Sequence, residues 1–106
     1  MQEILFKNDR YKKNRGGHSR WLLLSCEKCQ NKVAIYQKDG PGILKRLYLD
    51  RIVDIKDFSG KNLVCKKCQA ILGVKIIYKK ENRSAYRLFV GAVEKKTISR
   101  SHLSLN

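Results

Sequence analysis

Acidic residues are scarce in this chain, and long apolar runs are missing. Of 106 residues, 9 are Asp or Glu and 24 are Lys or Arg, so the formal net charge is +15. The longest apolar stretches, Trp21 to Leu24 and Leu88 to Val93, have the length of a strand and fall far short of the ~20 residues that span a bilayer. No basic amphipathic helix is evident that could lie on a membrane. We therefore expect one small domain without a membrane partner.

Cysteine is limited to four residues, which form two C-x-x-C pairs, Cys26/Cys29 and Cys65/Cys68. A two-residue spacer allows both sulfurs of a pair to face one metal ion. A soft divalent ion such as Zn2+ is held by four thiolates at ~2.3 Å. The pattern therefore predicts one structural zinc ion, whose binding energy would stabilise a small fold.

Two other uses of the cysteines fit the sequence less well. Two disulfides would require an oxidising compartment, but the segment Met1 to Phe6 does not resemble a secretory signal, so we expect reduced thiols and a cytoplasmic protein. A thioredoxin-like redox site needs only one pair and leaves the second without a role. Because four cysteines complete the metal shell, His18 and His102 are expected to be ordinary polar residues.

Catalytic groups are lacking as well. No cysteine remains as a nucleophile once four sulfurs bind the metal, and a closed four-thiolate zinc has no open position for water. The acidic candidates in the middle of the chain have no His or Ser partner at a useful spacing; they are Asp39, Asp50, Asp54 and Asp57. We expect that the protein is not an enzyme and has no small-molecule substrate.

The excess of positive charge favours a polyanionic partner, because such an excess destabilises a compact state by self-repulsion. Basic residues gather in residues 1–20 and in residues 61–80, the latter without any acidic residue. The candidate nucleic-acid contacts are Lys7, Arg10, Lys12, Lys13, Arg15, Arg20, Lys61, Lys66, Lys67, Lys75, Lys79 and Lys80. Any one of them could be a solvated surface charge, but together they predict phosphate binding.

Apolar, β-branched segments separated by turn residues predict a mostly β fold of small antiparallel sheets. Residues 44–58 fit both helix and strand spacing, and we expect a short helical turn followed by a strand at 51–55. The other expected strands are 21–25, 33–36 and 63–64, with a hairpin of 71–78 and 85–93; turns are expected at 39–42, 59–62 and 79–83. Residues 1–20 are expected to be a flexible basic arm, 21–96 the four-cysteine domain and 97–106 a loose polar tail.

Two segments of the chain resemble a known family. They are Lys45-Arg46-Leu47-Tyr48-Leu49-Asp50-Arg51-Ile52-Val53-Asp54-Ile55 and Leu63-Val64-Cys65-Lys66-Lys67-Cys68-Gln69-Ala70-Ile71-Leu72-Gly73-Val74-Lys75, within residues 45–93. This part of the chain resembles the Yippee-like zinc proteins and the wider β-tent group. The resemblance implies two antiparallel sheets that meet at the zinc. Reductases of that group need a further cysteine, which this chain lacks.

These observations predict a zinc-stabilised RNA-binding module, which could be a small component of the ribosome or of another ribonucleoprotein. RNA is favoured over DNA. Two alternatives stay open: a β-tent module that binds a protein or a small ligand, and a DNA-binding or transcription-associated zinc ribbon. Trp21 is expected in the core. The tyrosines that could stack on bases, but are expected to pack on a sheet, are Tyr11, Tyr36, Tyr78 and Tyr86.

Overall fold

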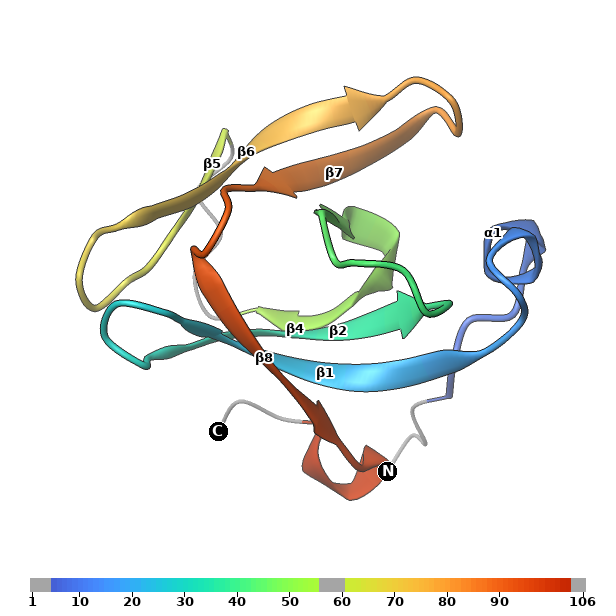
Figure 1. The fold of residues 1–106 in the computed structure, drawn as a ribbon, viewed down its shortest axis with the longest axis horizontal. Coiled ribbons are helices and arrows are strands. Elements are labelled where there is room, and N and C mark those ends of the chain that lie inside the picture. Colours follow the sequence, from blue (N-terminus) through green and yellow to red (C-terminus); the bar gives the residue numbers. More distant parts are fainter. Residues whose placement is uncertain (1–4, 56–60, 104–106) are drawn as a thin grey trace.

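Two four-stranded antiparallel sheets make up the protein in the computed structural model, which describes residues 5–55 and 61–103 (Figure 1). The first sheet has the strand order β4-β2-β1-β8, and the second has the order β3-β7-β6-β5. The strands are β1 (Ser19–Cys26), β2 (Lys32–Asp39), β3 (Arg46–Tyr48), β4 (Ile52–Ile55), β5 (Asn62–Val64), β6 (Ile71–Tyr78), β7 (Arg83–Leu88) and β8 (Val93–Ile98). The helix α1 spans Arg10–Asn14, and 3-10 helices span Leu49–Arg51 and Arg100–His102. The expected mostly β class with antiparallel sheets is confirmed.

The two sheets approach each other at the cysteine loops and diverge toward α1 (Figure 1). One cysteine pair lies in the loop between β1 and β2, and the other lies in the loop between β5 and β6. At the opposite, open end, the segment that leads into β3 lies between the sheets. Among the described residues, no helix has the length and hydrophobicity needed to cross a bilayer.

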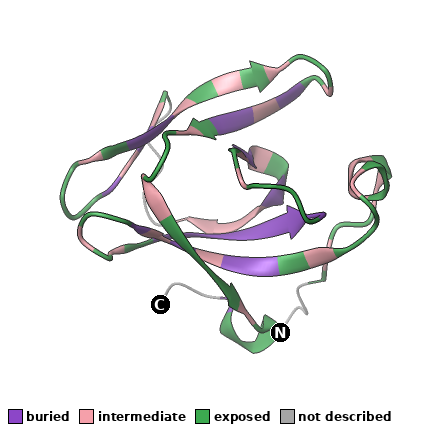
Figure 2. Cartoon of the chain, in the orientation of Figure 1, coloured by how far each residue is buried: buried purple, intermediate pink, exposed green. Residues whose placement is uncertain are grey.

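The main core lies between the sheets, where their apolar faces meet (Figure 2). Its fully buried side chains include Leu24, Leu47, Leu63 and Tyr86, and the sulfurs of the buried cysteines belong to the same cluster. Burial of side chains of this size contributes about 1.5–3 kcal/mol each. The core therefore continues directly into the cysteine cluster.

A second apolar cluster covers the outer side of the first sheet. Trp21 and Ile35 form it together with Leu103, and the ring of Phe6 stacks on Trp21 at a centroid distance of 4.1 Å. The prediction that Trp21 is a core residue is confirmed. Residues from both ends of the described chain thus pack on the same face.

Most predicted strands are present, and the largest differences from the prediction lie at three places. β3 precedes the predicted helical turn and was not expected; the turn itself is the 3-10 helix before β4. The strand predicted at 85–93 ends at Leu88, and Gly91 has a positive φ of 72° in the following turn. The predicted loose tail begins inside β8, which extends to Ile98, and Leu103 is buried. Residues 1–4 of the predicted arm, residues 56–60 and residues 104–106 of the predicted tail lie outside the described residues.

Residues 7–20 belong to the segment expected to be a flexible arm, and in the structure several of their polar groups bind other parts of the fold. The backbone N–H of Lys7 donates to Oε1 of Gln37 at 2.8 Å. Asp9 accepts hydrogen bonds from the backbone of α1 and pairs with Arg51 at 2.5 Å. Arg15 pairs with Glu81 at 2.6 Å, so side chains of the N-terminal segment contact both sheets.

Gly73 is a position where no side chain fits. A Cβ placed there would lie 2.6 Å from the carbonyl oxygen of Arg87 on β7. We expect Gly73→Ala to destabilise the fold by about 1–3 kcal/mol, as overpacking does, and to lower Tm in thermal unfolding. Gly42→Ala is the matched control, since its Cβ would meet nothing within 4 Å. Equal Tm values for the two variants would contradict the packing.

Candidate metal centre and basic surfaces

The four cysteines lie together between the two sheets. One ligand atom from each lies within 4.8 Å of the others, and the closest Sγ–Sγ distances are 3.4 Å (Cys29 to Cys65) and 3.6 Å (Cys26 to Cys68). Four ligands at ~2.3 Å from a tetrahedral ion would stand ~3.8 Å apart. The cluster could therefore hold one metal ion with little rearrangement, with each sheet supplying two ligands.

The two cysteine loops have the same backbone conformation. In each, the residue after the second cysteine is a glutamine, Gln30 or Gln69, with a positive φ of 64°. The backbone N–H of each glutamine donates to the carbonyl of the first cysteine in its loop at 2.8 Å. Each glutamine side chain also donates to a carbonyl of its own loop, that of Glu27 or Lys66. These bonds hold the left-handed turn that brings both sulfurs of a pair to one side.

Local hydrogen bonds favour ionisation of one sulfur at the centre of the cluster. Burial opposes ionisation of Cys65, but backbone N–H groups of Cys68 and Lys67 and the thiol of Cys29 bind its sulfur and lower its pKa to about 6. The backbone N–H of Asn31 favours the thiolate of Cys29, whereas burial and the neighbouring sulfurs raise its pKa to about 11. Binding of a metal ion at neutral pH must therefore release protons.

Four thiolates around one ion would complete a tetrahedral shell and leave no position for a substrate. Cys26 and Cys65 are buried, and Cys29 and Cys68 lie nearer the surface. The amide of Asn31 approaches the sulfur of Cys65 at 3.9 Å and adds a weak N–H···S contact. The four sulfurs could thus hold a metal ion in the manner of a structural site.

Five of the basic residues expected to contact nucleic acid lie together at the open end. Arg10, Lys12 and Lys13 are on α1, and Lys79 and Lys80 are in the turn between β6 and β7. The turn and the helix are joined because the hydroxyl of Tyr11 donates to the carbonyl of Glu81 at 3.3 Å. We call these five residues the basic end.

Arg15 directly follows α1 and pairs with Glu81 beside the basic end, but the other six candidates do not join this surface. Lys66 and Lys67 lie in the second cysteine loop, at the other end of β6 from Lys79 and Lys80. The eight residues of β6 span ~26 Å. Lys61 and Lys75 are neighbours beside β5 and β6, whereas Lys7 and Arg20 lie at the N-terminal side of β1. The twelve predicted residues thus form separate groups on the structure, and their contact with nucleic acid stays a prediction.

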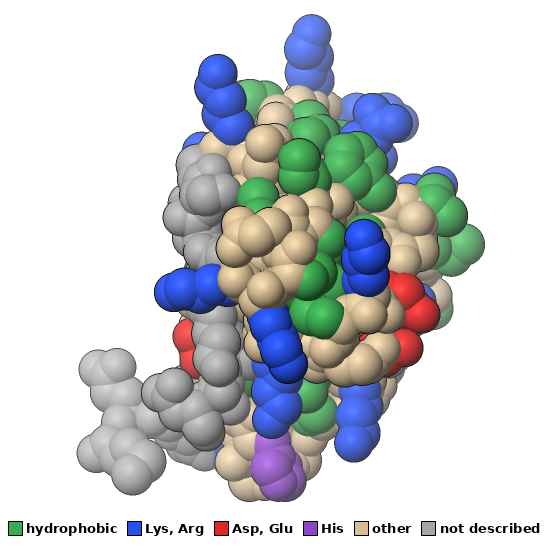
Figure 3. Space-filling model, turned by 90° about the vertical axis from the view of Figure 1, so that its left-hand side faces the viewer, with side chains coloured by type: hydrophobic (Ala, Val, Ile, Leu, Met, Phe, Trp, Pro, Cys, Tyr) green, Lys and Arg blue, Asp and Glu red, His purple; other side chains and the backbone are tan. Residues whose placement is uncertain are grey.

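Charges are mixed on the side of the molecule that carries the cysteine loops. Figure 3 shows Lys and Arg side chains there, separated by apolar groups and with acidic groups toward the edges. Glu27, within the first loop, has a raised pKa because the charge of Glu94 lies close by. A pair of neighbouring carboxylates weakens attraction of a polyanion at this side.

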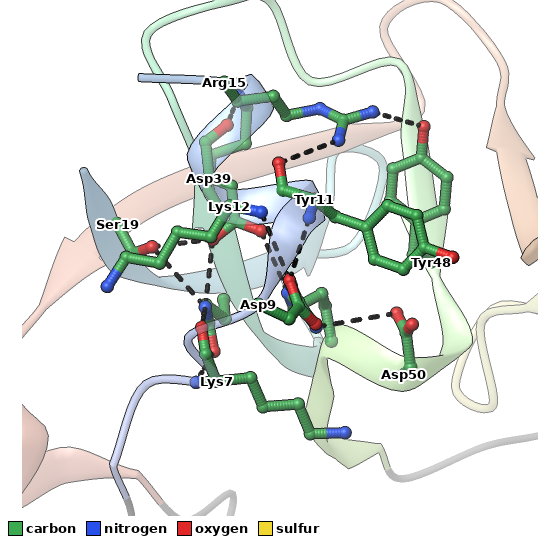
Figure 4. A network of polar contacts seen from close by, with 12 residues as sticks. Lys7, Asp9, Tyr11, Lys12, Arg15, Ser19, Asp39, Tyr48 and Asp50 are labelled. Carbon is green, nitrogen blue, oxygen red and sulfur yellow. Dashed lines mark hydrogen bonds and ion pairs between the residues drawn. The ribbon is translucent and has the colours of Figure 1, made fainter. Parts of the chain in front are cut away.

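At the open end, by contrast, arginines engage the carboxylates. Arg51, whose side chain is 1% exposed, binds Asp39 through Nε at 2.9 Å and also binds Asp9. Burial raises the pKa of Asp39, but hydrogen bonds from Ser19, Gln37 and Arg51 outweigh it and lower the pKa (Figure 4). The acids at this end are thereby bound to arginines of the interior, and the exposed lysines add a net positive potential.

Arg83 forms the second part of this network. It binds Asp50 at 2.6 Å and Glu81 at 2.7 Å. Its guanidinium also lies over the rings of Tyr48 and Tyr11, at 3.7 and 4.1 Å from their centroids. Cation–π contacts of this kind, when shielded from water, contribute about 1–2 kcal/mol to stability. Arg83 therefore joins α1, the start of β7 and the end of β3.

The tyrosines considered for base stacking are mostly occupied by the fold. Tyr36 and Tyr86 are buried, as expected for sheet packing. Tyr11 lies against Arg83, and the guanidinium of Arg46 covers the ring of Tyr78 at 4.1 Å. The rings of Tyr11 and Tyr78 therefore each have a face in contact with an arginine.

Arg51 and Arg83 were not among the residues expected to matter. The sequence signal was weak: Arg51 stands between the apolar residues Leu49 and Ile52, which is also compatible with an exposed turn. Only the long-range partners, Asp9 and Asp39, identify it as a buried charge. Partner positions of this kind cannot be read from a local pattern.

Comparison of the chain with protein-family models, with curated proteins and with solved structures gives no match in any of the three. The resemblance of residues 45–93 to the Yippee-like group therefore stays a prediction.

Proposed function

We propose that this protein is a zinc-stabilised RNA-binding module that contacts phosphates through the basic end. The observation that carries the proposal is the juxtaposition of α1 and the β6–β7 turn, which unites Arg10, Lys12, Lys13, Lys79 and Lys80. With a formal net charge of +15, the chain has a strong attraction for a polyanion. A place in a ribonucleoprotein would suit such a small basic domain.

RNA is the better candidate than duplex DNA because of the shape of this surface. α1 has five residues, which is less than two helical turns, and it is tied to the sheets through Asp9. It offers no recognition helix long enough to lie along a major groove. A helix end beside a lysine-rich turn can contact the irregular backbone of folded or single-stranded RNA.

Zinc is the metal that the donor set supports best. Four sulfurs within 4.8 Å form a soft, closed shell, which suits Zn2+ and excludes Mg2+ and Ca2+. Elemental analysis of protein purified without added metal is expected to give about one zinc per chain. An equivalent of iron, with the colour of an iron–thiolate centre, would contradict zinc as the native ion.

Reversal of charge in the β6–β7 turn tests the RNA proposal. We expect Lys79→Glu/Lys80→Glu to weaken binding of a structured RNA about tenfold or more at low salt, because two phosphate contacts become repulsive. The slope of log K against log salt should also become shallower by ~1–2. Fluorescence anisotropy at several salt concentrations measures both quantities.

The matched control is Lys66→Glu/Lys67→Glu, which changes the net charge equally at the other end of β6. It should weaken binding distinctly less. Equal losses in the two double variants would show that total charge governs binding and not the basic end. No binding of the unmodified protein at low salt would exclude the RNA function altogether.

A protein-interaction module is the second candidate, favoured by one apolar groove. The groove has a volume of about 460 Å3 and includes Ile43, Phe89 and Val90, whose side chains are exposed. Exposed apolar groups that cluster in a groove are typical of protein contacts. Affinity for a partner bound there would change little with salt, in contrast to RNA binding.

A further inference from the structure

A small cavity at the open end is lined by an unusual number of cations. Its volume is about 70 Å3, and Arg15, Lys38, Lys45 and Arg46 all line it together with the ring of Tyr48. Among its described lining residues, Asp39 is the one acid. The carboxylate of Asp39 is already bound by Ser19, Gln37 and Arg51. Arg15 is paired with Glu81, so the positive charge that the cavity presents comes from Lys38, Lys45 and Arg46.

Lys38 is the buried cation of this cavity. The residue is 8% exposed, and its ammonium donates to the backbone carbonyls of Asp39 at 2.9 Å and of Gly40 at 3.1 Å. An ammonium has three donors, so one N–H remains for a further acceptor after these two bonds. A buried ammonium held by carbonyls alone is costly unless an anion approaches it.

Two arginines of the cavity wall are fixed in place by aromatic side chains. Arg15 donates through Nη2 to the hydroxyl of Tyr48 at 3.0 Å and is also held by Glu81 (Figure 4). Arg46 stacks on Tyr78. Lys45 is exposed at the rim. Preorganised guanidinium groups bind oxyanions with several charge-assisted hydrogen bonds at once.

The volume limits what the cavity can hold. A single water needs about 10–15 Å3 of such space, so 70 Å3 accommodates about five water-sized atoms. That is the size of a tetrahedral oxyanion. Sites for larger organic ligands usually measure about 300–1,000 Å3.

We propose that this cavity binds one phosphate group, with Lys38, Lys45 and Arg46 as its donors and Arg15 as a positioned charge at the wall. Arg15 directly follows α1, so the cavity adjoins the basic end. The proposal deepens the RNA function where the phosphate belongs to an RNA terminus. The same chemistry also accepts free phosphate, and the source is decided by experiment.

The test begins with inorganic phosphate titrated into the zinc-loaded, full-length protein at constant ionic strength, with chloride as reference. The expected result in 1H–15N NMR spectra is saturable shifts at residues 38–48 and at Arg15. Lys45→Met/Arg46→Met should weaken phosphate binding about tenfold, because two charge-assisted bonds are lost. Lys38→Met should also weaken phosphate binding. If Lys38→Met does not fold, Lys45→Met/Arg46→Met still tests the site.

Lys75→Met is the matched control, since Lys75 is exposed on β6 and is not a lining residue. Its affinity for phosphate should stay within about twofold of the unmodified protein, as expected for a distant surface charge. Shifts that never saturate, or equal losses in the pocket and control variants, would overturn the site.

A second experiment identifies the source of the phosphate. An RNA oligonucleotide with a 5′-phosphate is compared with the same oligonucleotide ending in a 5′-hydroxyl. Tighter binding of the phosphorylated RNA, lost in Lys45→Met/Arg46→Met, assigns the pocket to an RNA terminus. Saturable phosphate binding without this preference supports the pocket as a site for the free anion. The Lys79/Lys80 variants test RNA binding separately, so the two proposals can fail independently.

Discussion

Removal of the metal is expected to unfold the domain. Structural zinc contributes about 10–16 kcal/mol in small zinc domains, which matches or exceeds the 5–15 kcal/mol stability of a typical domain. In this fold the ion would join the β1–β2 loop to the β5–β6 loop and so hold the two sheets together. A strong chelator at neutral pH should therefore abolish near-UV circular dichroism and the dispersion of NMR signals.

Two controls make this result specific. Chelator that has been saturated with zinc beforehand should leave the spectra unchanged. Cys68→Ser should reproduce the loss of structure, whereas Lys67→Ser, one position away in the same loop, should fold normally. Native spectra after complete removal of the metal would show that the core alone stabilises the sheets.

Loss of the buried charge at Arg51 is expected to have the next largest effect. Arg51→Met removes the ion pairs of this side chain with Asp9, Asp39 and Asp50, and it leaves Asp39, 5% exposed, as a buried carboxylate without its cation. Breaking a buried pair in this way costs about 3–5 kcal/mol. Urea unfolding monitored by Trp21 fluorescence should show a lower midpoint with a similar slope, and the midpoint shift multiplied by that slope should equal this loss of stability.

The double variant Arg51→Met/Asp39→Asn distinguishes a stranded charge from lost packing. It should recover part of the stability lost in Arg51→Met, because no unpaired carboxylate remains. Arg20→Met, at an exposed position of β1, should stay within about 0.5 kcal/mol of the unmodified protein. If the double variant is no more stable than Arg51→Met, packing of the long side chain is the dominant contribution.

The cysteine cluster could be predicted from the sequence because its information is local. Each C-x-x-C pair forms its own loop, and the ligand chemistry leaves few ways to combine two such pairs. The structure brings the four sulfurs together as expected. The turn glutamines, Gln30 and Gln69, were not predicted, since a positive φ is uncommon for glutamine and is held here by its own side-chain bond.

The order of the N-terminal segment could not be predicted, because its partners are far away in the chain. Asp9 and Arg51 are 42 positions apart, and Arg15 and Glu81 are 66 positions apart. Read locally, the same residues are a charged, glycine-containing stretch typical of a flexible arm. Only the fold shows that these charges are complementary.

The edge strands β3 and β8 were also not predicted from the sequence. β8 has the sequence Val-Glu-Lys-Lys-Thr-Ile, and its four central residues are exposed, so neither alternation nor an apolar run marks it. β3 has three residues, too few for a periodic signal. β8 is defined by its pairing with β1, and β3 is defined by its pairing with β7. Neither strand is marked by its own residue pattern.

During biosynthesis, β1 is completed long before the strand that pairs with its second edge. β1 lies between β2 and β8, with Trp21 opposite Ile98. At ~5–20 residues per second, the interval between the end of β1 and the end of β8 lasts ~4–14 s. Over this time an apolar strand edge is open to other nascent chains. Even with abundant metal, correct folding in cells would therefore benefit from chaperones that shield this edge until translation is complete.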